Sequence, residues 1–138
     1  MQITRQADYA VRAIYYLSAF EPGKRAATSQ IAKEQHIPPS FLAKIISQLS
    51  VAGLLHTSRG ARGGVSLARD PNEITMLDVV EAIDGPIMLN ECVEDAHGCK
   101  FDQECPMRDM WSEIQDDLVT RLGSTTFADF VEEKKAKE

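Results

Sequence analysis

Apolar residues recur every three or four positions through the first fifty residues of the chain, and this period predicts three short helices. The first helix is expected over residues 4–20, and the second over residues 28–35 with Thr28 as its N-cap. The third begins near Pro39, a residue suited to the first helical position, and continues to about Ala52. The stretches "EPGKRA" and "IPPS" separate these helices, and the short turn before the third is typical of a helix-turn-helix.

Two short β-like runs, "LLHTS" and "GVSLA", follow the third helix and predict a hairpin with the glycine-rich, doubly basic tip "RGARG". This order is typical of a winged helix-turn-helix, although the pattern alone also fits a small α+β domain that binds nothing. The following "TMLD" resembles a capping box and opens a helix that ends at "DGP". We therefore expect a mainly α fold with a small β-hairpin wing, and a core that closes by residue 85.

A long helix is expected to begin at Pro106, and its apolar residues share one face. They are Met107, Met110, Trp111, Ile114, Leu118 and Leu122. Because the core should already be complete, we expect this face to form a homodimer, the alternative being a helix that folds back on its own domain. The stretch "TTFADFVEEKKAKE" predicts a final short helix that frays into a charged tail. The expected division is a winged helix-turn-helix domain over 1–85, a cysteine-rich loop over 86–106, and a dimerisation helix with a tail over 107–138.

The charge of the chain is divided unevenly between its halves. Residues 1–69 hold nine Lys and Arg against three Asp and Glu, a balance of +6, whereas residues 70–138 hold six against eighteen, a balance of −12. The net charge of −6 hides this asymmetry, which indicates a basic front half that meets a polyanion such as nucleic acid. We expect a binding protein rather than an enzyme, because the sequence contains no phosphate loop, nucleophile elbow or paired-carboxylate motif.

No apolar run approaches the ~20 residues that a membrane-spanning helix needs. The stretch "MQITRQADYAVR" lacks the continuous apolar segment of a signal peptide. We therefore expect a cytoplasmic protein without a membrane partner. In that reducing compartment, cysteines more often bind metals or catalyse reactions than form structural disulfides.

All three cysteines, Cys92, Cys99 and Cys105, lie in one polar segment, "CVEDAHGCKFDQEC". An odd number cannot pair completely, and a polar loop is a poor place to bury free thiols. The flexible backbone around Gly98 would let three thiolates converge on an iron–sulfur cluster, leaving one position for another ligand. Zinc held by these cysteines and His97 is an alternative, although the spacing differs from the usual zinc knuckle. A regulator with a metal-free thiol switch is a third interpretation.

Four motifs together resemble those of the Rrf2 family of bacterial winged-helix regulators. They are "ITRQADYAVRAIYYLS", "IPPSFLAKIISQL", the stretch from "GLLHTSRGARGG" to "ITMLDVVEAIDGP", and the three-cysteine loop before a long helix. The resemblance covers nearly the whole chain. It implies a homodimeric transcriptional repressor that binds an imperfect palindrome in double-stranded DNA. It also implies an iron–sulfur cluster, of the 2Fe-2S or 4Fe-4S type, that senses nitric oxide, redox state or iron–sulfur supply.

The fourth ligand of the cluster differs between branches of this family. In one branch a His follows the third cysteine by three residues, and here that position is Arg108. In the branch that senses nitric oxide, an Asp early in the first helix reaches the cluster of the partner subunit, and Asp8 occupies the matching place. The resemblance therefore implies Asp8 as the fourth ligand, although the residue type alone also fits an ordinary solvent-facing acid. His36 and His97 are lesser candidates.

Helix-turn-helix proteins place the N-terminal part of the recognition helix in the major groove of DNA. Ser40 can then bond a base edge or a phosphate, and Lys44 a phosphate. Arg59 and Arg62 flank the tip of the wing and suit a narrow, electronegative minor groove. The expected DNA-contacting residues are Thr28, Ser29, Pro39, Ser40, Phe41, Lys44, Arg59 and Arg62.

Overall fold

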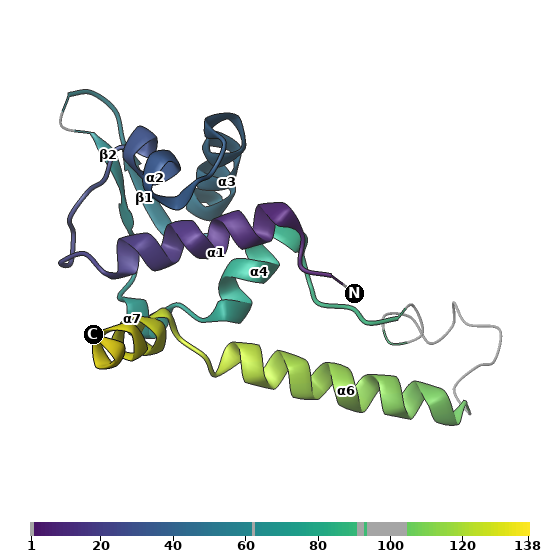
Figure 1. Ribbon diagram of the computed structural model, residues 1–138. Coiled ribbons are helices and arrows are strands. Elements are labelled where there is room, and N and C mark those ends of the chain that lie inside the picture. Colours follow the sequence, from purple (N-terminus) through teal and green to yellow (C-terminus); the bar gives the residue numbers. More distant parts are fainter. Residues whose placement is uncertain (1, 62, 91–92, 94–104) are drawn as a thin grey trace.

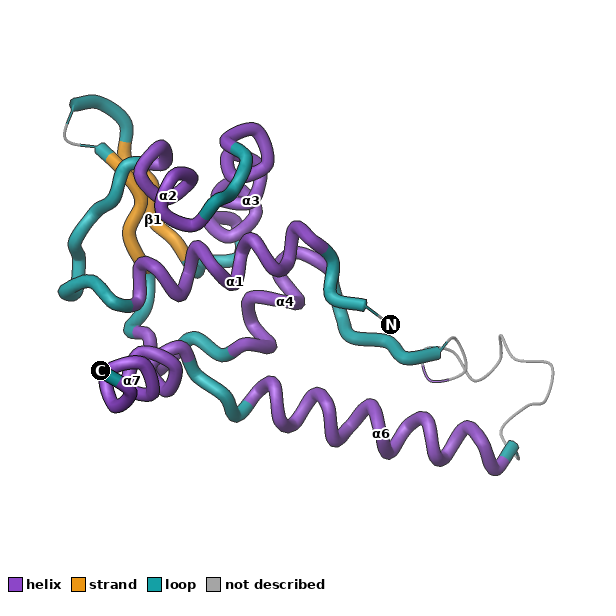
Figure 2. Tube along the Cα trace, viewed as in Figure 1, coloured by secondary structure: helices purple, strands orange, loops and turns teal. Residues whose placement is uncertain are grey.

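The computed structural model describes residues 2–61, 63–90, 93 and 105–138. Within them, the elements in chain order are α1 (Arg5–Ser18), α2 (Thr28–Gln35), α3 (Pro39–Val51), β1 (Leu55–Ser58), β2 (Gly64–Leu67), the 3-10 turn η1 (Pro71–Glu73), α4 (Met76–Asp84), α6 (Pro106–Gly123) and α7 (Phe127–Lys137). Helix α1 crosses the middle of the molecule, with α2, α3 and the hairpin on one side and α4 and α7 on the other (Figure 1). Helix α6 contacts α4 and extends beyond the other helices (Figure 2).

The core lies where α1 meets α3 and α4. The four residues predicted to point inward from α3 are buried: Leu42, Ile45, Ile46 and Leu49. On α1 the inner face carries Ala7, Ala10 and Ala13, which have no exposed surface, so neighbouring helices can approach closely. Full burial of a Leu or Ile side chain contributes about 1.5–3 kcal/mol, and these contacts therefore hold the three helices together.

The start of α2 is set by a contact with a residue distant in the sequence. Ala26 pairs with Val65 of β2 through two backbone hydrogen bonds of 2.9 and 2.8 Å. The chain stays extended through Ala27, whose φ and ψ are −68° and 144°, so helical geometry begins only at Thr28. The expectation that Thr28 caps α2 is therefore wrong, because Ala27 is the N-cap residue and no side chain caps this helix.

A short antiparallel bridge between Thr75 and Thr126 returns the chain to the core after α6. Two backbone hydrogen bonds of 2.9 and 3.1 Å flank the bridge. The side chain of Phe127, next to it, is fully buried in the main core. The expectation that the core closes by residue 85 is therefore wrong, because α7 supplies a core residue from much further along the chain.

Both residues of the bridge also begin a helix. Thr75 and Asp78 form the capping box predicted for α4, and each side chain accepts the other residue's backbone N–H at 3.0 Å. Thr126 and Asp129 form an equivalent box at the start of α7. With its start fixed in this way, α7 remains helical through Lys137, and the three lysines of its last turn complement the helix dipole. The expectation of a frayed tail is therefore wrong.

Helix α6 begins at Pro106, as predicted, and none of its residues is buried in the protomer. Met107, Met110 and Ile114 of the predicted apolar face are exposed. This exposure supports a partner for α6, and the dimer itself stays a prediction. The three-part division of the chain also stays a prediction, with α7 packed against the first part. No helix in the described ranges, α6 included, is long and apolar enough to cross a membrane.

Replacing Phe127 with Ala tests whether α7 belongs to the core. Removing a fully buried Phe side chain loses its transfer free energy and leaves a cavity, so the free energy of unfolding should fall by about 3–5 kcal/mol. Circular dichroism during urea unfolding, at a fixed protein concentration, measures this change. The control Val51→Ala, at a site that is 87% exposed, should change it by less than about 0.5 kcal/mol. A loss of less than about 1 kcal/mol in Phe127→Ala would mean that α7 contributes little to the core.

Candidate nucleic-acid interface and metal centre

The turn between α2 and α3 is short, and a backbone hydrogen bond and two prolines restrict its conformation. Helix α2 ends at Gln35, and its C-cap residue, His36, adopts the left-handed conformation with φ 54° and ψ 48°. The next residue, Ile37, is buried, and its N–H donates to the carbonyl of Ala32 at 2.9 Å. Pro38 is the N-cap residue of α3 and Pro39 is its first helical residue, as predicted. The turn therefore presents the start of α3 at the surface.

The outer face of α3 carries several of the predicted DNA-contacting side chains. Ser40, Phe41 and Lys44 are all exposed, Phe41 by 44%. Ala43 and Ser47 are exposed on the same helix. Ser47 was not predicted, although its spacing of two helical turns from Ser40 was a signal for it. The face consists of short side chains with one cation and one aromatic ring.

The ring of Phe41 is in contact with α1. Its centroid lies 6.2 Å from that of Tyr9, and the two ring planes are inclined by 50°. Tyr9 is only 8% exposed, and the guanidinium of Arg12 lies 5.5 Å from its ring centroid. Sequence reasoning missed this contact, because the spacing of the aromatic residues does not show that α1 and α3 meet there.

At the start of α2, Ser29 is exposed and Thr28 is partly exposed. No side chain caps this helix, so its first backbone N–H groups lack the capping acceptor that many helices have. Such N–H groups are suited to a phosphate oxygen. Gln30 donates from Nε2 to the hydroxyl of Tyr16 at 2.7 Å, which ties the start of α2 to α1.

The hairpin predicted as a wing is confirmed, with Ser58 of β1 opposite Gly64 of β2. Arg59 is exposed directly after β1, whereas Arg62 lies outside the described residues. A Cβ atom at Gly63 would overlap the carbonyl oxygen of Ser58, so the tip can close only with glycine at this position. This tight closure holds Arg59 at the end of the hairpin.

Asp8, the predicted fourth ligand, lies on the first turn of α1. Its Oδ2 is 2.6 Å from Nη2 of Arg12, and the two side chains are 49% and 43% exposed. Both residues line an open pocket that His36 also lines. Two of the candidate fourth ligands therefore line the same pocket, while His97 lies outside the described residues. No sequence signal placed His36 near Asp8.

Cys105 is the cysteine that lies within the described part of the chain. It is the N-cap residue of α6, it is partly exposed, and its thiol is free. Cys92 and Cys99 fall outside that part, so the set of cysteine ligands stays a prediction. Among the described residues, no group of three metal-ligating side chains is formed.

The stretch between the end of α4 and Cys92 is tied to two helices. Thr4, the N-cap residue of α1, donates from Oγ1 to Oδ1 of Asp84 at 2.5 Å. The backbone N–H of Leu89 donates to Oε1 of Gln115 in α6 at 2.9 Å. Ile87, between these two anchors, is buried. The loop therefore starts from a fixed position that depends on both α1 and α6.

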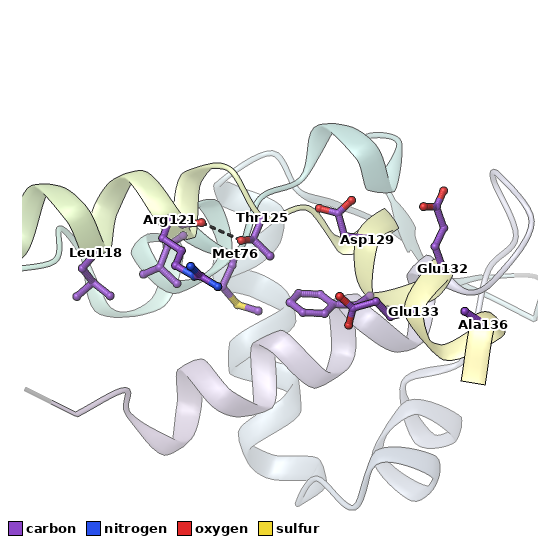
Figure 3. Close-up of a pocket in the computed structure, with 10 residues that line it drawn as sticks. Met76, Leu118, Arg121, Thr125, Asp129, Glu132, Glu133 and Ala136 are labelled. Atoms are coloured by element: carbon purple, nitrogen blue, oxygen red, sulfur yellow. Dashed lines mark hydrogen bonds between the residues drawn. The ribbon is translucent and has the colours of Figure 1, made fainter. Parts of the chain in front are cut away.

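An open pocket lies where α4, α6 and α7 meet, and Figure 3 shows its lining residues. Leu118 of the predicted apolar face lines it together with Met76 and Phe130. Arg121 and three acidic residues of α7 add charge to the same pocket. Thr125 donates from Oγ1 to the carbonyl of Arg121 at 2.8 Å, which closes the end of α6. The sequence did not predict this pocket, because it depends on where α7 packs.

A model of the Rrf2 family, described as an iron-dependent transcriptional regulator, matches residues 3–133. The chain belongs to the Rrf2 family. A protein of Aquifex aeolicus that is named as an HTH-type transcriptional regulator is 33% identical over 125 residues, which cover 89% of this chain and 86% of the relative. The family and this relative identify the chain as a DNA-binding transcriptional regulator rather than an enzyme, in agreement with the sequence prediction.

Solved structures of Rrf2 proteins share the fold. CymR, the global cysteine regulator of B. subtilis, is 28% identical with a TM-score of 0.81, covering 96% of this chain and 97% of that chain. IscR of T. potens is 22% identical with a TM-score of 0.80, covering 100% of this chain and 91% of that chain. The predicted winged-helix fold, mostly helical with a small hairpin, is confirmed.

The variant Gly63→Ala tests the role of the wing. Because the added Cβ would overlap the Ser58 carbonyl, the tip must open and Arg59 must move. We expect affinity for a specific duplex to fall by about tenfold, as for the loss of one arginine contact, with helix content unchanged. Fluorescence anisotropy at a fixed salt concentration measures the affinity. The control Ala61→Ser, exposed at the same tip, should bind within about twofold of wild type, and equal binding by Gly63→Ala would exclude the wing from the interface.

Proposed function

We propose that this protein is a homodimeric repressor that binds an imperfect DNA palindrome, and that an iron–sulfur cluster controls its affinity. The proposed ligands are Cys92, Cys99 and Cys105, with Asp8 of the partner subunit as the fourth. The position of Cys105 carries this proposal, because it places a thiol at the start of the exposed helix that is expected to form the dimer. The cluster is of the 2Fe-2S or 4Fe-4S type and senses nitric oxide, redox state or iron–sulfur supply.

The chemistry of the donor groups fits such a cluster. Thiolates are the usual ligands of iron–sulfur clusters, and Cys105 offers a free thiol at the N-terminal end of α6. Asp8 is half exposed, so a partner can reach its carboxylate if Arg12 moves aside. When bound, the cluster supplies a reactive centre for nitric oxide or oxygen.

The proposed DNA interface combines the outer face of α3, the start of α2 and the wing. Its residues are Thr28, Ser29, Pro39, Ser40, Phe41, Lys44, Arg59 and Arg62. The balance of +6 in residues 1–69 and the exposure of the α3 cation support this assignment. In a dimer, two recognition helices must lie about 34 Å apart to meet successive turns of DNA, so the placement of the subunits determines affinity.

Contacts around the start of the cysteine loop support a coupling between the loop and the DNA interface. Gln115 connects the loop to α6, which is expected to set the spacing of the subunits. Thr4 connects Asp84, which ends α4 just before the loop, to α1, where Tyr9 contacts Phe41 of α3. Regulation requires different DNA affinities with and without the cluster, typically by about 5–150-fold. We assign repression to the cluster-bound protein.

Metal analysis of anaerobically purified protein tests the cofactor. We expect iron and acid-labile sulfide in comparable amounts, because three thiolates from one loop suit iron–sulfur ligation. Stoichiometric zinc without sulfide would instead support a regulator stabilised by zinc at the three cysteines and His97. Protein without metal would support a thiol switch.

Comparison of the cluster-bound and cluster-free proteins tests regulation by the cluster. The affinity for the promoter of the protein's own operon, relative to a scrambled duplex at the same salt concentration, should differ by at least about fivefold between the two forms. Equal affinities would leave the cluster with a purely structural role.

The variant Asp8→Ala tests the fourth ligand. It should still dimerise, but the visible spectrum of its cluster should change and the cluster should decay faster in air, because one ligand is lost. Asp8→Cys should give a more stable cluster, since thiolate binds iron more strongly than a carboxylate does. Glu34→Ala, which removes another exposed acid, is the control and should match wild type. An unchanged spectrum in Asp8→Ala would exclude Asp8 and turn the search to His36 and His97.

A further inference from the structure

Phe41 is an exposed aromatic residue in the first turn of α3. It is 44% exposed, whereas Leu42, its neighbour in the chain, is fully buried. Its N–H donates to the carbonyl of Pro38 at 3.1 Å, so the turn fixes its backbone. This large apolar side chain lies on the helix expected to enter the major groove, and nearly half of its surface stays exposed to water in the free protein.

The exposed ring is held in place before any partner binds. The inclined contact with Tyr9 is of the kind that attracts aromatic rings, and the Arg12 guanidinium supports Tyr9 in turn. Tyr9 is itself nearly buried, so this support belongs to the core of the domain. A side chain that is positioned in advance loses less conformational entropy when it meets a partner.

Short side chains surround Phe41 on the outer face of α3. Ser40, Ala43 and Ser47 are exposed and small, so the helix can approach base edges closely. Successive residues of a helix are about 100° apart, which places Phe41 at one edge of this face, beside Ser40. The ring can therefore reach the bases from the side of the helix.

The apolar group that base pairs present in the major groove is the C5-methyl group of thymine, while the other groups are hydrogen-bond donors and acceptors. We propose that Phe41 is a specificity-determining residue that contacts the C5-methyl group of one thymine in each half-site, and that Tyr9 positions its ring. This inference rests on the proposed function, in which α3 is the recognition helix.

Deoxyuridine tests this contact, because it differs from thymidine only by the missing methyl group. A specific duplex is selected from a random library with the 138-residue chain, and each thymine of the half-sites is then replaced in symmetric pairs. Replacing one pair should weaken binding by about fourfold per half-site, the effect of leaving one methyl group unburied. Fluorescence anisotropy at fixed salt measures each affinity.

Variants of the protein assign the effect to residues. Phe41→Ala should bind the thymine duplex as weakly as wild type binds the deoxyuridine duplex, and should no longer distinguish the two. Tyr9→Leu should lose part of the discrimination, whereas Tyr9→Phe keeps the ring and should retain it. Val51→Ala, at an exposed apolar site on the other end of α3, is the matched control and should discriminate like wild type. Circular dichroism verifies that each variant is folded.

Two results would overturn the inference: equal binding of thymine and deoxyuridine duplexes by wild type, or full discrimination by folded Phe41→Ala. Full discrimination by folded Tyr9→Leu would overturn the role assigned to Tyr9. Failure of the proposed function would look different, because the selection would then return no preferred duplex at all.

Discussion

The antiparallel bridge between Thr75 and Thr126 is the contact on which the arrangement of the whole chain depends. Each threonine also begins a capping box, so this one pair sets the starts of both α4 and α7. Helix α6 ends at Gly123, just before the bridge, and its C-terminal end is therefore attached to the core. Because Phe127 is buried beside the bridge, the C-terminal end of α6 is held against the winged helix-turn-helix domain.

Helix α1 links residues near the proposed cluster site to residues of the proposed DNA interface. At its start, Thr4 binds Asp84 at the end of α4, close to the ion-paired Asp8. Shortly after, Tyr9 contacts Phe41 on the helix proposed to meet DNA. Because protein interiors are close-packed, a helix with alanines against its neighbours has little room to tilt without moving them. We therefore expect a displacement at the start of α1 to reach α3 through the contact of Tyr9 with Phe41.

Features that depend on neighbours within one or two helical turns could be predicted from the sequence, and features made by distant contacts could not. The capping box of Thr75 and the buried face of α3 follow from local spacing. Thr28 was misassigned as a cap because pairing with Val65, far along the chain, decides where α2 begins. In the candidate site, the ion pair of Asp8 with Arg12 follows from their spacing of four residues on one helix. The position of His36 beside the same pocket could not be predicted, because it depends on how α2 packs against α1.

The position of the bridge also bears on how regulators of this kind can diverge. Helix α4 precedes α6 in the chain and Thr126 follows it, and both belong to the same folded core, so α6 lies in a segment inserted between two parts of that core. The entropic cost of closing such an insertion rises slowly, by about 0.6 kcal/mol for each doubling of its length. Evolution can therefore lengthen, shorten or replace the inserted segment, while the winged-helix domain keeps its own fold.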